Sequence, residues 1–136
     1  MSQDPKEWSY VERLIDQSKP KSIPVPQVAP GQETPSGFKM PTAKPGDYPY
    51  HVRRATSWML PVYVSQPWRD GQPSATITTI RKVEGDVDAL RKDLCKFLFD
   101  RYEQEFISQP NEFMQKVVFR GNFDADFKEF LKMKGF

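Results

Sequence analysis

Three segments after residue 47 alternate apolar and polar positions: residues 49–54 (PYHVRR), 60–65 (LPVYVS) and 74–83 (SATITTIRKV). They are rich in β-branched and aromatic residues, and loops containing Gly, Pro and Ser separate them, which is typical of β-strands. Because consecutive strands with short connections usually pair with one another, the three segments predict an antiparallel meander.

The apolar spacing changes after this region and predicts a helix over residues 86–102. Its apolar positions recur every three or four residues on one face: Val87, Leu90, Leu94, Phe97, Leu98 and Tyr102. Asp86 stands where an N-cap is expected, and Asp88 and Lys92 form an i,i+4 pair in the favoured orientation. This segment therefore predicts an amphipathic helix that covers a core.

A second, shorter helix is predicted at the end of the sequence, over residues 124–136 (DADFKEFLKMKGF). Asp124 is positioned to cap its first turn. Gly135 is expected to end the helix in the left-handed conformation, so that Phe136 folds back onto Leu131 in a Schellman ending.

Residues 114–121 (MQKVVFRG) read as one more strand, after a polar break at residues 108–113. The order of strand, strand, strand, helix, strand, helix predicts an α+β fold, with a single mixed sheet of about four strands and two helices on one of its faces. The intervening helix is long enough for the strands at 76–83 and 116–120 to run parallel through a right-handed crossover.

The N-terminal part, residues 1–47, predicts an extended arm that precedes a compact domain at residues 48–136. Nine of the 13 prolines lie before residue 50, and proline removes amide donors and disfavours helix in the residue before it. The pattern near residues 8–15 favours one short helix. The arm is not typical of a disordered tail, because apolar residues recur along it: Trp8, Tyr10, Val11, Leu14, Ile15, Ile23, Val25 and Phe38.

Composition and charge narrow the class of protein. With 136 residues and a net charge of +2, the chain suits one domain with an extension and is not a polycation, so any contact with nucleic acid must come from local clusters. Cys95 is the single cysteine, which excludes an internal disulfide and fits a reducing environment. The apolar run at 58–64 is too short to cross a bilayer. Residues 1–10 resemble neither a secretory signal nor a transit peptide.

Local clusters of basic residues accompany tryptophans in the loops, a combination that favours contact with RNA. Guanidinium groups form paired hydrogen bonds with phosphate and stack on bases. The alternative is a solvated strand end with ordinary ion pairs to Glu84 or Asp86. The candidate contact residues are Arg53, Arg54, Arg81, Lys82, Arg91, Arg120, Trp58 and Trp68.

Three residues of the helix at 86–102 allow two interpretations each. Arg91 lies at the edge of the apolar face, where its stem either covers the core or contacts a partner. Cys95 and Phe99 lie together beside that face, where they either widen the buried surface or mark a second apolar contact with a neighbouring protein.

No motif in the sequence indicates catalysis or metal binding. Gly85 and Asp86 join a strand to a helix, but one glycine is too few for a phosphate loop, and an aspartate cap would repel phosphate. His51 is the single histidine, and its pairing with Cys95 is the weak alternative for a nucleophilic site. One histidine and one cysteine also fall short of a zinc site. We therefore expect no enzymatic activity, no cofactor and no small-molecule substrate.

Several motifs, taken together, resemble the mitochondrial large-subunit ribosomal protein family numbered forty-nine, also called the integrity-of-mitochondrial-genome family. They cover about three quarters of the chain and occur in this order: TPSG (34–37), YPYHVRR (48–54), LPVY (60–63), TTIRKVEGDVDALRKDL (78–94), VVFRG (117–121) and FDADFKEFLKMKGF (123–136). The second half is also similar, more distantly, to the small eukaryotic initiation factor that monitors start-codon selection.

The resemblance implies a structural protein of the mitochondrial large ribosomal subunit, bound to ribosomes in the matrix, that contacts ribosomal RNA and neighbouring ribosomal proteins. The alternative is a dissociable, initiation-factor-like module. The residues at 65–75 (SQPWRDGQPSA) carry one Arg and one Asp, whereas such a module would want a basic loop there. By resemblance, four residues shape turns and five supply charge for partners: Gly85, Asp86, Gly121 and Gly135, then Arg53, Arg54, Arg81, Lys82 and Arg120.

Overall fold

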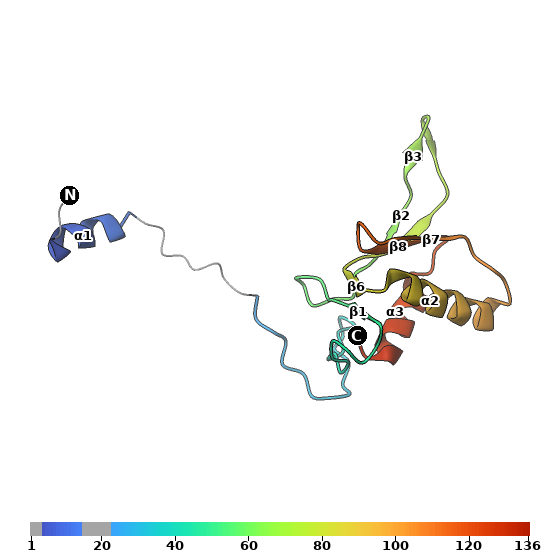
Figure 1. Ribbon diagram of the computed structural model, residues 1–136, viewed down its shortest axis with the longest axis horizontal. Coiled ribbons are helices and arrows are strands. Elements are labelled where there is room, and N and C mark those ends of the chain that lie inside the picture. Colours follow the sequence, from blue (N-terminus) through green and yellow to red (C-terminus); the bar gives the residue numbers. More distant parts are fainter. Residues whose placement is uncertain (1–3, 15–22) are drawn as a thin grey trace.

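The computed structural model describes residues 4–14 and 23–136 (Figure 1). Ile15, predicted as an apolar anchor at the end of the arm helix, lies outside these residues. The elements in chain order are α1 (Pro5–Glu12), β1 (Tyr50–Val52), β2 (Val62–Ser65), β3 (Trp68–Arg69), β4 (Gln72–Pro73), β5 (Ile77–Ile80), β6 (Val83–Gly85), α2 (Val87–Tyr102), β7 (Ser108–Asn111), β8 (Lys116–Arg120) and α3 (Asp124–Lys134).

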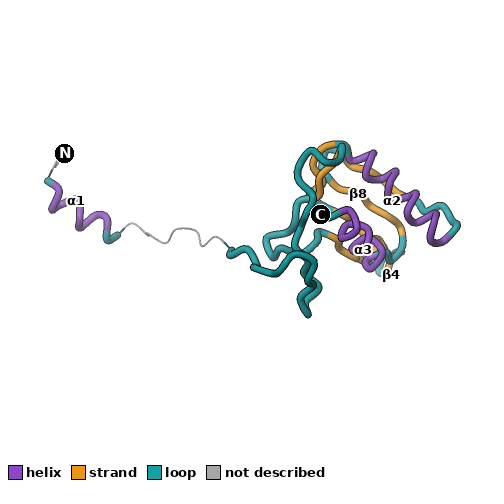
Figure 2. Tube along the Cα trace, turned by 90° about the horizontal axis from the view of Figure 1, so that it is seen from below, coloured by secondary structure: helices purple, strands orange, loops and turns teal. Residues whose placement is uncertain are grey.

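A four-stranded sheet in the order β2-β5-β8-β7 forms the centre of the fold, with α2 and α3 packed on one of its faces (Figures 1 and 2). This arrangement confirms the α+β class, the four-stranded sheet and the position of the helices. The core between the layers includes Ile80, Leu90 and Phe127, which are fully buried. The rings of Phe119 and Phe127 meet edge to face across the layers, with centroids 4.8 Å apart.

The expectation of a parallel pair is wrong, because β5 and β8 are direct neighbours and run antiparallel. The break predicted at residues 108–113 contains β7, which forms a hairpin with β8 at the edge of the sheet. The crossover through α2 therefore leads to β7, which is parallel to β5, and the hairpin then inserts β8 between them. Pro110 lies on this outer strand, where a missing amide hydrogen is tolerated.

The segment predicted as one strand at 74–83 is two strands in different sheets. Lys82 adopts a positive φ of 57°, which turns the chain after β5 so that β6 pairs with β1 in a separate two-stranded sheet. The expected meander is thus wrong for β1, which does not pair with β2. The loop between β2 and β5 also forms a short hairpin of β3 and β4, with a turn at Asp70-Gly71.

Of the three features predicted at the helix ends, two are confirmed and one is wrong. Asp86 caps α2, as predicted, because its side chain accepts hydrogen bonds from the amides of Asp88 and Ala89. The Schellman ending of α3 is also confirmed, since the amide of Phe136 donates to the carbonyl of Leu131. The predicted capping by Asp124 is wrong: this residue is the first of the helix, and it pairs with Lys128 at 2.7 Å.

Residues 33–43, here called the strap, lie along the C-terminal end of α3. The amides of Thr42 and Ala43 donate to the carbonyl of Gly135 at 2.8 and 2.9 Å. Phe38 is buried, and Glu33 pairs with Lys132. The end of the arm is therefore fastened to the domain, whereas no residue of α1 is buried.

Three glycines permit close approaches that a side chain would prevent. Gly85 has a φ of 90°, and an added Cβ would lie 2.6 Å from the carbonyl oxygen of Pro49. Gly135, with a φ of 88°, faces Thr42 and Ala43 of the strap. At Gly121 an added Cβ would lie 2.5 Å from the ring of Phe123, and the carbonyl of this glycine accepts a hydrogen bond from the buried hydroxyl of Thr78. The turn-forming role expected of all three stays a prediction.

Candidate nucleic-acid interface

The face of the four-stranded sheet opposite the helices, here called the open face, carries basic and polar side chains. Strand register places one set of residues on it, because side chains alternate between the two faces of a sheet. None of these residues is acidic, so the open face is an electropositive surface. They are Tyr63, Ser65, Ile77, Thr79, Gln109, Asn111, Lys116, Val118 and Arg120.

Arg81 extends the open face beyond the end of β5. Its guanidinium lies over the ring of Tyr63, with the Cζ atom 5.6 Å from the ring centroid. Both side chains are exposed, and in the described part of the chain Arg81 forms no ion pair. A cation over the face of an aromatic ring retains donors for a phosphate or a base.

Arg120 and Arg69 meet at the opposite end of the open face. The β3–β4 hairpin projects from the sheet on the side away from the helices (Figure 1). At its base lies a pocket of about 380 Å³, here called the hairpin pocket. Arg69 comes from the hairpin and Arg120 from β8. The residues that line it are Pro67, Arg69, Ser74, Ala75, Ile77, Ile107, Gln109, Val118 and Arg120.

Arg53 and Lys82 form a second basic site beside the end of β1. Arg53 is exposed and lies 3.4 Å from the carboxylate of Glu84, which is the ion pair expected of an ordinary strand end. Both basic residues line a pocket of about 510 Å³ together with Trp58 and Ile23. Because one carboxylate already offsets the charge of Arg53, this site is less electropositive than the open face.

Arg54 is half-buried, and its guanidinium makes its contacts within the protein. Its guanidinium donates to the main-chain oxygens of Trp58, at 3.0 Å, and Phe136, at 2.6 Å. It also lies over the ring of Phe38 in the strap. Burial lowers the pKa of Arg54 from its ordinary value. This residue therefore joins the strap, the turn after β1 and the end of α3.

The two tryptophans occupy different surroundings. Trp58 is half-buried in a turn with a positive φ of 61°. Trp68, which was predicted in a loop, lies in β3 and is 72% exposed. Because neighbouring strand residues point to opposite sides, Trp68 faces away from the hairpin pocket that Arg69 lines. Only Trp68 is therefore fully available to stack against a partner.

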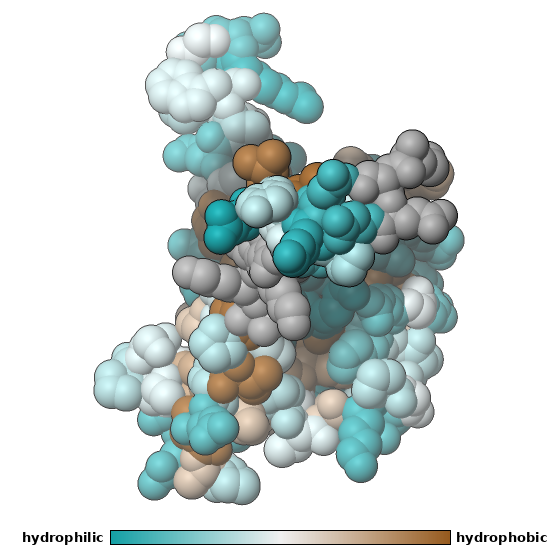
Figure 3. Space-filling view, turned by 90° about the vertical axis from the view of Figure 1, so that its left-hand side faces the viewer, coloured by the Kyte–Doolittle hydropathy of each residue, from teal (hydrophilic) through white to brown (hydrophobic). Residues whose placement is uncertain are grey.

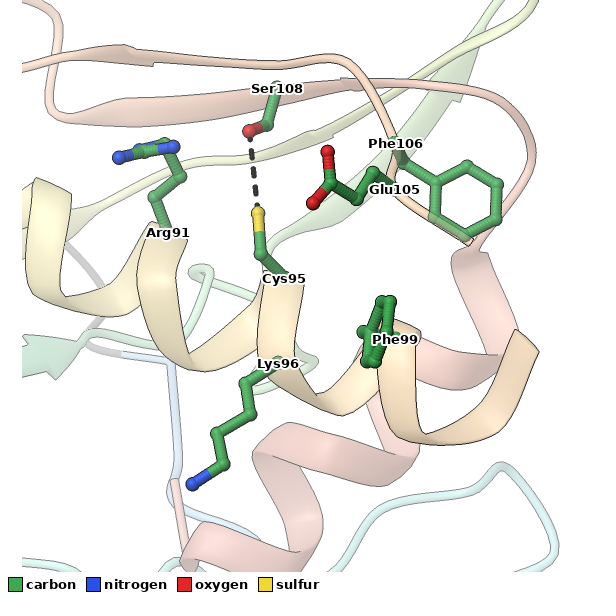
Figure 4. A pocket seen from close by; sticks show the side chains of 7 residues that line it. All are labelled: Arg91, Cys95, Lys96, Phe99, Glu105, Phe106 and Ser108. Atoms are coloured by element: carbon green, nitrogen blue, oxygen red, sulfur yellow. Dashed lines mark hydrogen bonds between the residues drawn. The ribbon is translucent and has the colours of Figure 1, made fainter. Parts of the chain in front are cut away.

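The helix face around Arg91 contains a third pocket of about 380 Å³ (Figure 4). Arg91 pairs with Asp88 at 2.7 Å, and this hydrogen bond raises the pKa of the guanidinium. Cys95 packs against the core and contacts Ser108, whereas Phe99 stays 51% exposed. The carboxylate of Glu105 also lines the pocket, which makes it less suited to an anion than the open face.

The contacts of His51 and Cys95 give no support to the catalytic alternative that pairs these two residues. His51 packs edge-on against Phe136, while the Cys95 thiol contacts the hydroxyl of Ser108 at 3.4 Å. No group of three or more potential metal ligands occurs within residues 4–14 and 23–136. Over the same residues, no helix is long and apolar enough to span a membrane.

Comparison with known proteins identifies the family of this chain. The family described as mitochondrial large subunit ribosomal protein (Img2) matches residues 48–136, which is the part that contains the sheet, α2 and α3. The chain belongs to this mitochondrial ribosomal protein family. Membership supports a structural, non-enzymatic role in the large subunit of the mitochondrial ribosome, as the resemblance implied.

Two relatives of this chain extend this result. The chain is 30% identical to large ribosomal subunit protein mL49 of Caenorhabditis elegans over 139 aligned residues, which cover 97% of this chain and 72% of the relative. It is 33% identical to mL49 of Schizosaccharomyces pombe over 87 residues, covering 64% of this chain and 77% of the relative. The first alignment includes the arm as well as the domain.

Sequence reasoning missed several residues of the open face and of the hairpin pocket beside it. Arg69, Lys116, Tyr63 and Gln109 were not among the candidate residues. Lys116 and Arg120 are four residues apart on one strand and therefore share a face. This spacing could have indicated Lys116 from the sequence. Arg69 had no such signal, because its position depends on how the β3–β4 hairpin folds against the sheet.

Proposed function

We propose that this structural protein of the mitochondrial large ribosomal subunit contacts ribosomal RNA through its open face. The observation that carries the proposal is the absence of any acidic residue among the outward side chains of the sheet, together with three arginines that have no ion pair in the described residues: Arg69, Arg81 and Arg120. Arg53 and Lys82 form a secondary contact, and Arg54 serves the fold.

Three features of the basic residues on this surface support contact with phosphate. The guanidinium groups of the arginines can form paired hydrogen bonds with phosphate oxygens, and no carboxylate must first be displaced. Arg81 is held over Tyr63, which reduces the side-chain entropy that binding would cost. Along β8, Lys116 and Arg120 lie about 13 Å apart, from roughly 3.3 Å per residue. Cations at both ends of the strand let the sheet follow an extended backbone.

The test is the salt dependence of binding between the purified full chain and mitochondrial large-subunit ribosomal RNA transcribed in vitro. Each phosphate contact that is lost should reduce the log–log slope of affinity against salt by roughly 0.7 to 0.9. We expect this reduction for Arg81→Ala and for Arg120→Ala. Lys92→Ala, on the helix side of the domain, removes the same charge and should leave the slope unchanged.

Equal slopes for all three variants and the unaltered chain would overturn the proposal. If the log–log slope of affinity against salt falls only in Arg53→Ala and Lys82→Ala, the RNA contact lies at the pocket beside β1 instead. Circular dichroism and urea unfolding of each variant separate these outcomes from a loss of folding, which is not expected because the substituted arginines are exposed.

A further inference from the structure

The hairpin pocket is the strongest candidate for a specific subsite on the open face. The outer side of the sheet supplies one wall through Ile77, Val118 and Arg120, and the β3–β4 hairpin supplies another through Pro67 and Arg69. Its volume of about 380 Å³ is at the lower end of the range of roughly 300–1,000 Å³ for small-molecule sites. The space suits one nucleotide rather than several.

The lining of this pocket combines positive charge with apolar surface. Arg69 and Arg120 come from different elements, and neither forms an ion pair within the described residues. Ile77, Ile107 and Val118 provide the apolar surface. An anion with a flat, weakly polar ring matches this combination, because the guanidinium groups bind phosphate while the ring displaces water from the aliphatic side chains.

Gln109 adds a hydrogen-bonding group at the edge of the apolar surface. It lies on β7, directly opposite Val118, and both side chains point to the open face. A glutamine amide both donates and accepts hydrogen bonds, as does the edge of a nucleobase. A lipid headgroup or an inorganic phosphate would leave the apolar wall and this amide unused.

The hairpin also restricts the form of RNA that can enter. It projects from the sheet (Figure 1), and Pro67 and Arg69 form one side of the pocket lining. A regular duplex that lies on the open face therefore cannot place a paired base inside. Bases of double-stranded RNA are stacked and paired, whereas those of loops and bulges can turn outward. Only an unpaired nucleotide brings both its phosphate and its base to these residues.

We propose that the hairpin pocket binds one unpaired nucleotide of RNA. Arg69 and Arg120 hold its phosphate, Ile77, Ile107 and Val118 contact the face of the base, and Gln109 binds the edge of the base. This inference rests on the proposed contact between the open face and RNA, and it adds a preference for bulged or single-stranded segments. On the face seen in Figure 3, apolar side chains are scattered among hydrophilic ones.

The experiment compares two RNA probes with the full chain at one fixed salt concentration. The first is a blunt-ended duplex of 16 base pairs, and the second is the same duplex with a single bulged adenosine. Apolar surface removed from water contributes roughly 25 cal/mol per Å², and a tenfold change in affinity corresponds to about 1.4 kcal/mol, so partial burial of one base against the aliphatic side chains is sufficient. We therefore expect the bulged probe to bind about tenfold more tightly.

Variants locate the preference in the hairpin pocket. Arg69→Ala and Ile107→Ser should remove most of the preference for the bulged probe while retaining most of the binding to the duplex. Ile107 is 70% exposed, so this change should not affect folding. Arg81→Ala is the matched control: it lies on the open face outside the pocket, so it should weaken both probes by the same factor.

Each contrary result has a distinct meaning. Equal binding of both probes, with Arg81→Ala still weakening them, would refute the nucleotide site and leave the open face as an RNA contact. A preference that survives Arg69→Ala and Ile107→Ser would also refute it, because the bulge would then bind elsewhere. If no substitution changes the binding of either probe, both proposals fail, and the open face serves a protein neighbour.

Discussion

Arg53 and Arg54 are adjacent and chemically identical, yet their surroundings give them different roles. Arg53 is exposed beside Glu84, while Arg54 donates hydrogen bonds to the main-chain oxygens of Trp58, four residues away, and of Phe136, 82 residues away. Consecutive extended residues point in opposite directions, so one of the pair faces solvent and the other faces inward. The pair illustrates that a basic dipeptide does not by itself identify a binding site.

We expect Arg54→Ala to destabilise the fold by roughly 2 kcal/mol, because hydrogen bonds from a charged group contribute about 1.5–3 kcal/mol and their acceptors would lose a partner. Arg53→Ala, which removes an exposed ion pair, should change the free energy of unfolding by less than about 0.5 kcal/mol. Urea unfolding of both variants measures this difference. Equal effects would show that Arg54 is not a structural tie.

Among the elements, the strap links the arm to the domain at the end of α3. Its ion pair between Glu33 and Lys132 is exposed, so its contribution is small, but it has a recognisable pH dependence. The hydrogen bond from Lys132 lowers the pKa of Glu33 below its ordinary value. A carboxyl group whose pKa is lowered by folding stabilises the folded state above its unfolded pKa of about 4.3, and this contribution is lost as the pH falls.

We therefore expect Glu33→Gln to lower the urea midpoint slightly at pH 7 and to have a smaller effect at pH 3, because the contribution of the carboxylate is lost as the pH falls through its lowered pKa. Glu7→Gln removes the same charge from α1, where no residue is buried, and should have no effect at either pH. A difference at pH 3 as large as that at pH 7 would show that the strap does not depend on this ion pair.

At the scale of the whole molecule, the two faces of the central sheet differ in what covers them. One face is covered by α2 and α3 and holds the core, whereas the other presents arginines without ion pairs among the described residues. A protein of this size can build a stable core on one face and leave the second for a partner. This division suits a component of a ribonucleoprotein particle.

We expect the chain to sediment with the large ribosomal subunit when a mitochondrial lysate is separated on a gradient at moderate salt. A variant with Arg69, Arg81 and Arg120 replaced by Ala should be released at lower salt than the unaltered chain, since fewer phosphate contacts hold it. Lys92→Ala should behave like the unaltered chain. Sedimentation as a free protein or with the small subunit would contradict both the structural role and the RNA contact.

The sequence by itself determined the features that depend on neighbouring residues: the apolar face of α2, its Asp86 cap, the Schellman ending at Gly135 and the motifs that resemble the family. Tertiary structure alone decided the place of β7, the division of residues 74–83 between two sheets and the main-chain contacts of Arg54. It also decided that Arg69 and Arg120 line the same pocket. The physical reason is the distance along the sequence over which each interaction acts. Caps and helical periodicity arise within a few residues, whereas strand order and the convergence of distant side chains depend on which segments pack together.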